Sequence, residues 1–211
     1  MQMEPKQTDP LYETKNESPE LYSGMEIADS PNRDLIGEKI HEANNVWETN
    51  RLNGSDISEA DRIADSIAEV DGIELIRSGE YGADYDNRCM NFAFGEINKE
   101  PWAEPHKQMP KEFNADTIAF LKQHSYQFVQ LPAEGDVILY TYAGQKQMDD
   151  PNYRIGFTHY GIVDKDNKVI SKFGQGPVVK HPAGLVPTNY GKYAYFMRKQ
   201  IPNTQNNIEP K

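Results

Sequence analysis

Apolar residues recur at helical spacing in two segments between Ser30 and Gly72. The first segment begins at Ser30-Pro31 and ends at Asn53-Gly54, which are typical helix start and stop signals. The second follows Ser55 or Asp56 as a cap and closes at Asp71-Gly72. The apolar positions are Leu35, Ile36, Ile40, Ala43 and Val46 in the first stripe, and Ile57, Ala60, Ile63, Ile67 and Val70 in the second. The spacing predicts two amphipathic helices, which together form a helical extension over residues 31–72.

The middle of the chain is predicted to contain one strand and two more helices. The run "IELIRSG" from Ile73 predicts a strand, and "CMNFAFG" from Cys89 predicts a helix that turns Phe92 and Ala93 inward. The stretch "NADTIAFLKQHSYQFV" predicts another helix, with Asn114 as its cap and its inner face continuing to Tyr126.

After Pro132 the pattern changes to short β-branched and aromatic runs separated by turn residues. The runs are "AEGDVILYTYAG", "FTHYGIVD", "NKVISKFG", "GPVVKHP" and "KYAYFMRK". The short link "DKDNK" between the second and third runs predicts an antiparallel hairpin. Helices followed by an antiparallel meander predict the α+β fold class, with the helices packed to one side of the sheet.

Composition separates the two ends from the folded part and excludes several functions. Residues 1–30 and 201–211 are polar and predicted to be disordered. The net charge of −11 argues against nucleic-acid binding, which needs clustered Lys and Arg. No apolar run is long enough to span a membrane, and the N-terminus has no apolar signal-peptide core. We therefore expect a cytoplasmic protein, or one exported by a route without a Sec signal peptide.

Cys89 is the only cysteine of the chain, so no intrachain disulfide can form. It stands where the polar loop "YGADYDNR" gives way to an apolar helix. The amides at a helix start favour a thiolate, which is the nucleophilic form of cysteine. The alternative is that Cys89 is a small buried apolar residue of the core.

A thiol nucleophile also needs a base, and His159 is the histidine best placed to provide one. It opens the strongly patterned strand "THYGIV", whereas His41 lies on an acidic helix. Gly161 leaves room beside that strand for another backbone to approach. A structural His159 bonded to a backbone group is the alternative interpretation.

A third polar group is needed to orient the imidazole. The next strand and loop offer Ser171, Gln175 and His181. By chemistry Gln175 or His181 suits the role better than Ser171, and the sequence leaves the choice open. The chain shows no metal-ligand spacing and no cofactor motif, so none is expected.

These residues carry a resemblance to a known superfamily. A cysteine that begins an apolar helix, then "GDVILY", "HYGIV" and another strand, resembles the NlpC-type and CHAP-like branch of the papain-like cysteine peptidases. The motifs "NRCMNFAFG" and "SKFGQGPVVKHP…VP..YG" are similar to an uncharacterised bacterial group within it. The resemblance implies a papain-like hydrolase domain over residues 73–200, with Cys89 as nucleophile and His159 as base. The third position of the family falls near Ser171, where the usual His, Asn or Gln is absent.

Two classes of function follow from the resemblance. The first is a cysteine hydrolase of amidase or peptidase type, acting on an amide or ester bond of a peptide, peptidoglycan or protein substrate. The alternative is an inactive papain-like module that binds a partner in the same groove, or a secreted effector with acyltransferase or deamidase activity. The missing third residue motivates the inactive module.

Overall fold

The computed structural model describes residues 24–79, 89–98, 116–150, 153, 155–174 and 176–200. Its helices are α1 (Pro31–Asn53), α2 (Ser58–Asp65), α3 (Cys89–Asn98), α5 (Asp116–Gln123) and α6 (Gln145–Met148), with the short 3-10 helices η1 (Ser66–Glu69) and η2 (Thr188–Tyr190). Its strands are β1 (Met25–Glu26), β2 (Glu74–Arg77), β3 (Tyr126–Val129), β4 (Val137–Thr141), β5 (Phe157–Val163), β6 (Val169–Lys172), β7 (Val178–His181) and β8 (Tyr193–Lys199).

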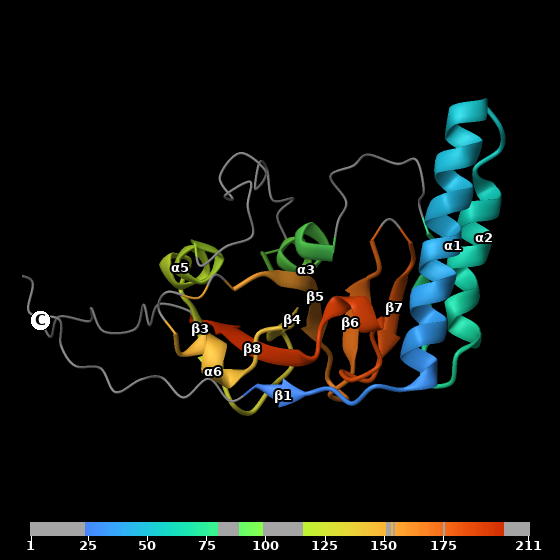
Figure 1. Cartoon of the computed structure of the whole chain (residues 1–211). Coiled ribbons are helices and arrows are strands. Elements are labelled where there is room, and N and C mark those ends of the chain that lie inside the picture. The colour runs from blue at the N-terminus through green and yellow to red at the C-terminus, as the bar shows by residue number, and fades with distance from the viewer. Residues whose placement is uncertain are drawn as a thin grey trace, which may run out of the picture.

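These strands form one antiparallel sheet in the order β1-β8-β4-β5-β6-β7-β2, and β3 pairs with β8 beside that path. Figure 1 shows α1 and α2 side by side at one end of the sheet, next to β7, while α3 lies over β5. The α+β class is therefore confirmed. The prediction that the helices pack to one side of the sheet was wrong, because α1 and α2 share an apolar cluster with one face, and α3 and α5 share one with the other. The predicted hairpin across "DKDNK" is also confirmed, because β5 and β6 are antiparallel neighbours.

The ends of α1 follow the predicted signals. Ser30 accepts a hydrogen bond from the backbone N–H of Arg33, and Gly54 closes the helix at a positive φ of 67°, which glycine adopts without steric cost. The second helix is shorter than predicted, because α2 ends at Asp65 and continues as η1. One position of the first stripe was wrong: Leu35 is largely exposed, and Arg33 is buried instead.

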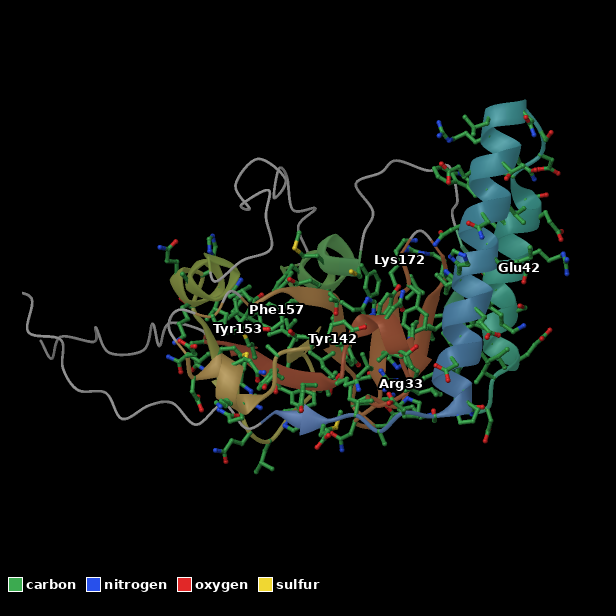
Figure 2. The ribbon with its side chains drawn as sticks, viewed as in Figure 1. Arg33, Glu42, Tyr142, Tyr153, Phe157 and Lys172 are labelled. Carbon is green, nitrogen blue, oxygen red and sulfur yellow. The ribbon has the colours of Figure 1, made fainter. Side chains whose placement is uncertain are left out.

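Arg33 fastens the start of α1 to the loop that precedes β8. Its guanidinium donates to the carbonyls of Val186 at 2.8 Å and Gly191 at 2.7 Å. Figure 2 shows Arg33 near the N-terminal end of α1, on the side that faces the sheet. A buried arginine is stable only when its donors are satisfied, and these carbonyls satisfy them.

Two sequence predictions need correction outside α1. The helix predicted from Asn114 to the end of "SYQFV" stops at Gln123, and Tyr126–Val129 is strand β3. Ser125 adopts a left-handed φ of 66°, which ends the helix and turns the chain into pairing with β8. The second correction concerns the predicted disordered tail, because Met25 and Glu26 form β1 and pair with β8.

The sheet has an apolar cluster on each face, since alternate residues of a strand point to opposite sides. One cluster joins α1 and α2 to the sheet through residues such as Ile40, Ala64 and Val179. The other joins α3 and α5 to the sheet through residues such as Phe94, Leu121 and Tyr160. Because α1 and α2 share a buried cluster with the strands, the helical extension and the sheet form a common core.

Candidate functional site

Cys89 occupies the first position of α3, as the sequence predicts. Its side chain is half-buried and packs against the cluster on the α3 face. The helix is held in place by Ala93 and Phe94, which are fully buried, and the Phe94 ring meets the Tyr160 ring edge-on at 5.9 Å. The thiol therefore lies at the N-terminal end of a firmly packed helix, where the helix dipole favours the thiolate.

Tyr160 is the ionisable residue of β5 that is on the same face as Cys89. Burial raises its pKa well above the ordinary value, and the neighbouring Cys89 raises it further. Tyr160 is therefore a neutral phenol at physiological pH.

His159 is fully buried, and its ring lies among aromatic side chains of the other sheet face. It stacks on Tyr190, with ring centroids 4.2 Å apart and planes 19° apart. Phe173 and Tyr140 lie at 5.3 and 5.5 Å from it. Neither ring nitrogen has a hydrogen-bond partner among the described residues. Burial lowers the pKa of His159 well below its ordinary value, with a further contribution from His181, so the imidazole is neutral at neutral pH.

Cys89 and His159 border the same cavity, which has a volume of about 370 Å³. They pack on different faces of the sheet, but both reach the cavity near the start of β5. The residues that line it are Asn44, Trp47, Glu48, Cys89, Thr158, His159, Gly174 and Tyr190. The thiol and the imidazole are not hydrogen-bonded to each other. Both residues nevertheless line one space.

The candidates for the third residue pair with each other instead of with His159. The Ser171 hydroxyl and His181 Nε2 lie 2.8 Å apart, and His181 Nδ1 lies 2.8 Å from the Pro182 carbonyl oxygen. A carbonyl only accepts, so Nδ1 carries the proton and Nε2 accepts from Ser171. Burial lowers the pKa of His181 to about 4. The ring of Phe173 is 5.3 Å from both imidazoles. Gln175 lies outside the described residues.

Six cavity residues were not predicted as site residues from the sequence: Asn44, Trp47, Glu48, Thr158, Gly174 and Tyr190. The first three lie on α1, whose helical pattern shows which side is buried but not which distant loop it meets. Tyr190 belongs to the "VP..YG" motif, and that motif was the one available signal for it.

The described part of the chain contains neither a metal-ligand cluster nor a membrane-spanning helix. No group of three or more His, Cys, Asp or Glu side chains there is arranged to hold a metal ion. Among the described helices, none combines the length and the hydropathy that a membrane span requires.

The fold and the cavity define an α+β protein with a cysteine at a helix start and a buried histidine beside it. Comparison with known families adds one assignment: the chain belongs to a family described as a domain of unknown function (DUF7689), whose model matches residues 78–198. The matched region contains Cys89, His159 and Tyr190 but none of α1. No curated protein and no solved structure matches the chain.

Proposed function

We propose that this protein is a cysteine hydrolase of amidase or peptidase type, with an NlpC-type papain-like arrangement of Cys89 and His159. The observation that carries the proposal is the shared cavity: the cysteine at the start of α3 and a fully buried imidazole with both nitrogens unpartnered among the described residues border one space. A buried polar group without a partner is costly, and such groups are concentrated at functional sites.

The chemistry follows from the protonation states. The neutral imidazole of His159 accepts the thiol proton of Cys89, and the sulfur attacks the carbonyl carbon of an amide or ester. The imidazolium then returns the proton to the leaving amine or alcohol as the C–N or C–O bond breaks, which leaves a thioester on Cys89. Water, deprotonated by His159, hydrolyses the thioester and restores the thiol. In this proposal, the unpaired backbone amides at the start of α3 stabilise the oxyanion.

In this proposal, aromatic rings orient the His159 imidazole in place of the missing third residue. Tyr190 stacks on the His159 ring at 4.2 Å, and the Phe173 ring meets the His159 ring edge-on at 5.3 Å. Stacking fixes the plane of an imidazole without a hydrogen bond. A peptide, peptidoglycan or protein amide remains the proposed class of substrate.

Alkylation of Cys89 tests the proposal directly, because the chain has no other thiol. We expect iodoacetamide to react with the wild-type protein at neutral pH faster than with an ordinary thiol, whose pKa is about 8.5. His159→Ala and His159→Gln are expected to slow the reaction at least about tenfold, because no base then accepts the thiol proton. His41→Ala is the matched control, since His41 is exposed on α1 and does not line the cavity.

Circular dichroism and urea unfolding of each variant separate loss of the base from loss of the fold. A folded His159→Gln protein whose Cys89 reacts at the wild-type rate would contradict the proposed function.

A second candidate is an inactive module that binds its partner in the same cavity. It is favoured by the lack of a hydrogen bond between Cys89 and His159 and by the closed pair that Ser171 and His181 form. Cys89 reactivity that is independent of His159 supports this candidate.

A further inference from the structure

The cavity beside Cys89 is completed by a segment that lies outside the matched family region. Asn44, Trp47 and Glu48 of α1 line it, whereas the family model begins at residue 78. We define these three residues as the α1 wall. Helix α1 is fixed in place by its shared core with the sheet and by the hydrogen bonds of Arg33. The α1 wall is therefore a stable part of the cavity.

Glu48 gives the α1 wall its charge. Its carboxylate is exposed, and no ion pair or hydrogen bond joins it to another of the described residues. Two other acidic residues on or near α1 act on Arg62: Glu59 pairs with it, and Glu42 acts on it electrostatically. Arg51 stands over the Trp47 ring at 5.1 Å, on the same helix, but is not among the residues that line the cavity.

We propose that the α1 wall selects substrates that carry a positively charged group next to the bond attacked by Cys89. This inference rests on the proposed function, because only an enzyme has a substrate. A carboxylate, an amide and an indole ring at one wall match an ammonium or guanidinium group: Glu48 supplies the opposite charge, Asn44 a hydrogen-bond acceptor and Trp47 an aromatic face. The substrate class is thus a peptide or amide with a lysine-like, arginine-like or free amino group.

Two thiol reagents with the same reactive group and opposite charge test the α1 wall at Cys89. They are the trimethylammonium-ethyl and the sulfonato-ethyl methanethiosulfonates. In each reaction the Cys89 thiolate attacks the sulfenyl sulfur, a mixed disulfide forms and methanesulfinate leaves. Because both reagents react with the thiolate, the thiol pKa cancels in the ratio of the cationic rate to the anionic rate. That ratio reports the charge of the cavity.

We expect Glu48→Gln to lower this ratio about threefold to tenfold, the effect of one unit charge acting on two opposite charges at about 6–12 Å in water. Glu42→Gln removes the same charge from the same helix on the side that acts on Arg62, and it is expected to leave the ratio unchanged. Raising the ionic strength to about 1 M should reduce the effect of Glu48→Gln, since the screening length falls to about 3 Å.

A ratio that is equal in wild type and Glu48→Gln, or one that falls equally in Glu42→Gln, would overturn the inference. The two proposals can fail separately, because the ratio does not depend on His159. If the His159 variants react at the wild-type rate while Glu48→Gln still lowers the ratio, the hydrolase is rejected and the wall recognises a cationic ligand of a binding module. If His159 is required but Glu48 has no effect, the hydrolase remains and its specificity lies elsewhere.

Discussion

His159 and His181 are two buried imidazoles whose surroundings keep them neutral. His181 donates from Nδ1 to the Pro182 carbonyl and accepts from Ser171, so both of its nitrogens are occupied. An added proton on Nε2 would break the bond from Ser171. His159 has no such partner among the residues that the structure describes, and it sits among aromatic rings. The two residues share a buried location but differ in their contacts: His181 on β7 bonds Ser171 on β6, and His159 lines the cavity.

The pKa of His181 predicts how stability depends on pH. Its value in the folded protein is about 4, against an ordinary value of 6.5. Between these values the unfolded chain binds the proton and the folded chain does not, so stability is lost as pH falls from 6.5 towards 4. The shift corresponds to about 3 kcal/mol for His181 alone. The lowered pKa of His159 acts in the same direction.

Urea unfolding at about pH 7 and about pH 4.5 measures this loss. In His181→Gln the part due to His181 disappears, so the difference between the two pH values should shrink by about 2–3 kcal/mol. Carboxylate protonation is common to both proteins and cancels in the comparison. A pH dependence that is identical in the variant would show that His181 titrates normally in the folded state.

At the scale of single elements, the strand register around Gly161 is tightly constrained. Gly161 lies opposite Ser171 in the β5–β6 pairing. A Cβ atom at position 161 would come within 2.5 Å of Val169 Cγ1 and within 3.1 Å of the Ile170 carbonyl oxygen. The prediction that Gly161 leaves room for another backbone is therefore confirmed, and the backbone is that of β6.

Gly161→Ala is expected to lower the free energy of unfolding by about 1–3 kcal/mol, because β6 must shift to admit the methyl group. Gly37→Ala is the matched control. Its nearest neighbour outside α1 would be Pro187 Cβ at 3.8 Å, an ordinary contact, so the better helix propensity of alanine should stabilise the protein by about 0.5–1 kcal/mol. Equal effects of the two substitutions in urea unfolding would contradict this account of β5 and β6.

The local pattern predicted most elements because their signals lie within the elements themselves. Ser30 and Gly54 bound α1, and the five β-branched runs became β4 to β8. It failed where tertiary pairing decided the outcome. Tyr126–Val129 fits an apolar helix face as well as a strand, and its pairing with β8 made it β3. Among the cavity residues, Cys89 and His159 are predicted as candidates from their local sequence. Tyr190 and the α1 wall are brought to the cavity by the tertiary fold, which the local sequence does not reveal.

At the scale of the whole molecule, α1 and α2 belong to the same core as the sheet. Ile36, Ile40 and Ile67 are buried in a cluster with strand and loop residues that include Phe173 and Val186. The sequence predicts a helical extension over residues 31–72 and a separate domain over residues 73–200. The shared cluster predicts that this division separates two parts that are stable only together.

We therefore expect a chain of residues 73–200 to lack a cooperative fold. It would expose the sheet face that α1 and α2 cover and leave the Val186 and Gly191 carbonyls without the Arg33 guanidinium. Near-ultraviolet circular dichroism, binding of a hydrophobic dye and urea unfolding measure this, with the full-length chain as control. Dye binding with a broad urea transition is the expected result. A sharp transition with the near-ultraviolet spectrum of the full chain would show that residues 73–200 fold alone, and that α1 serves the cavity without supporting the core.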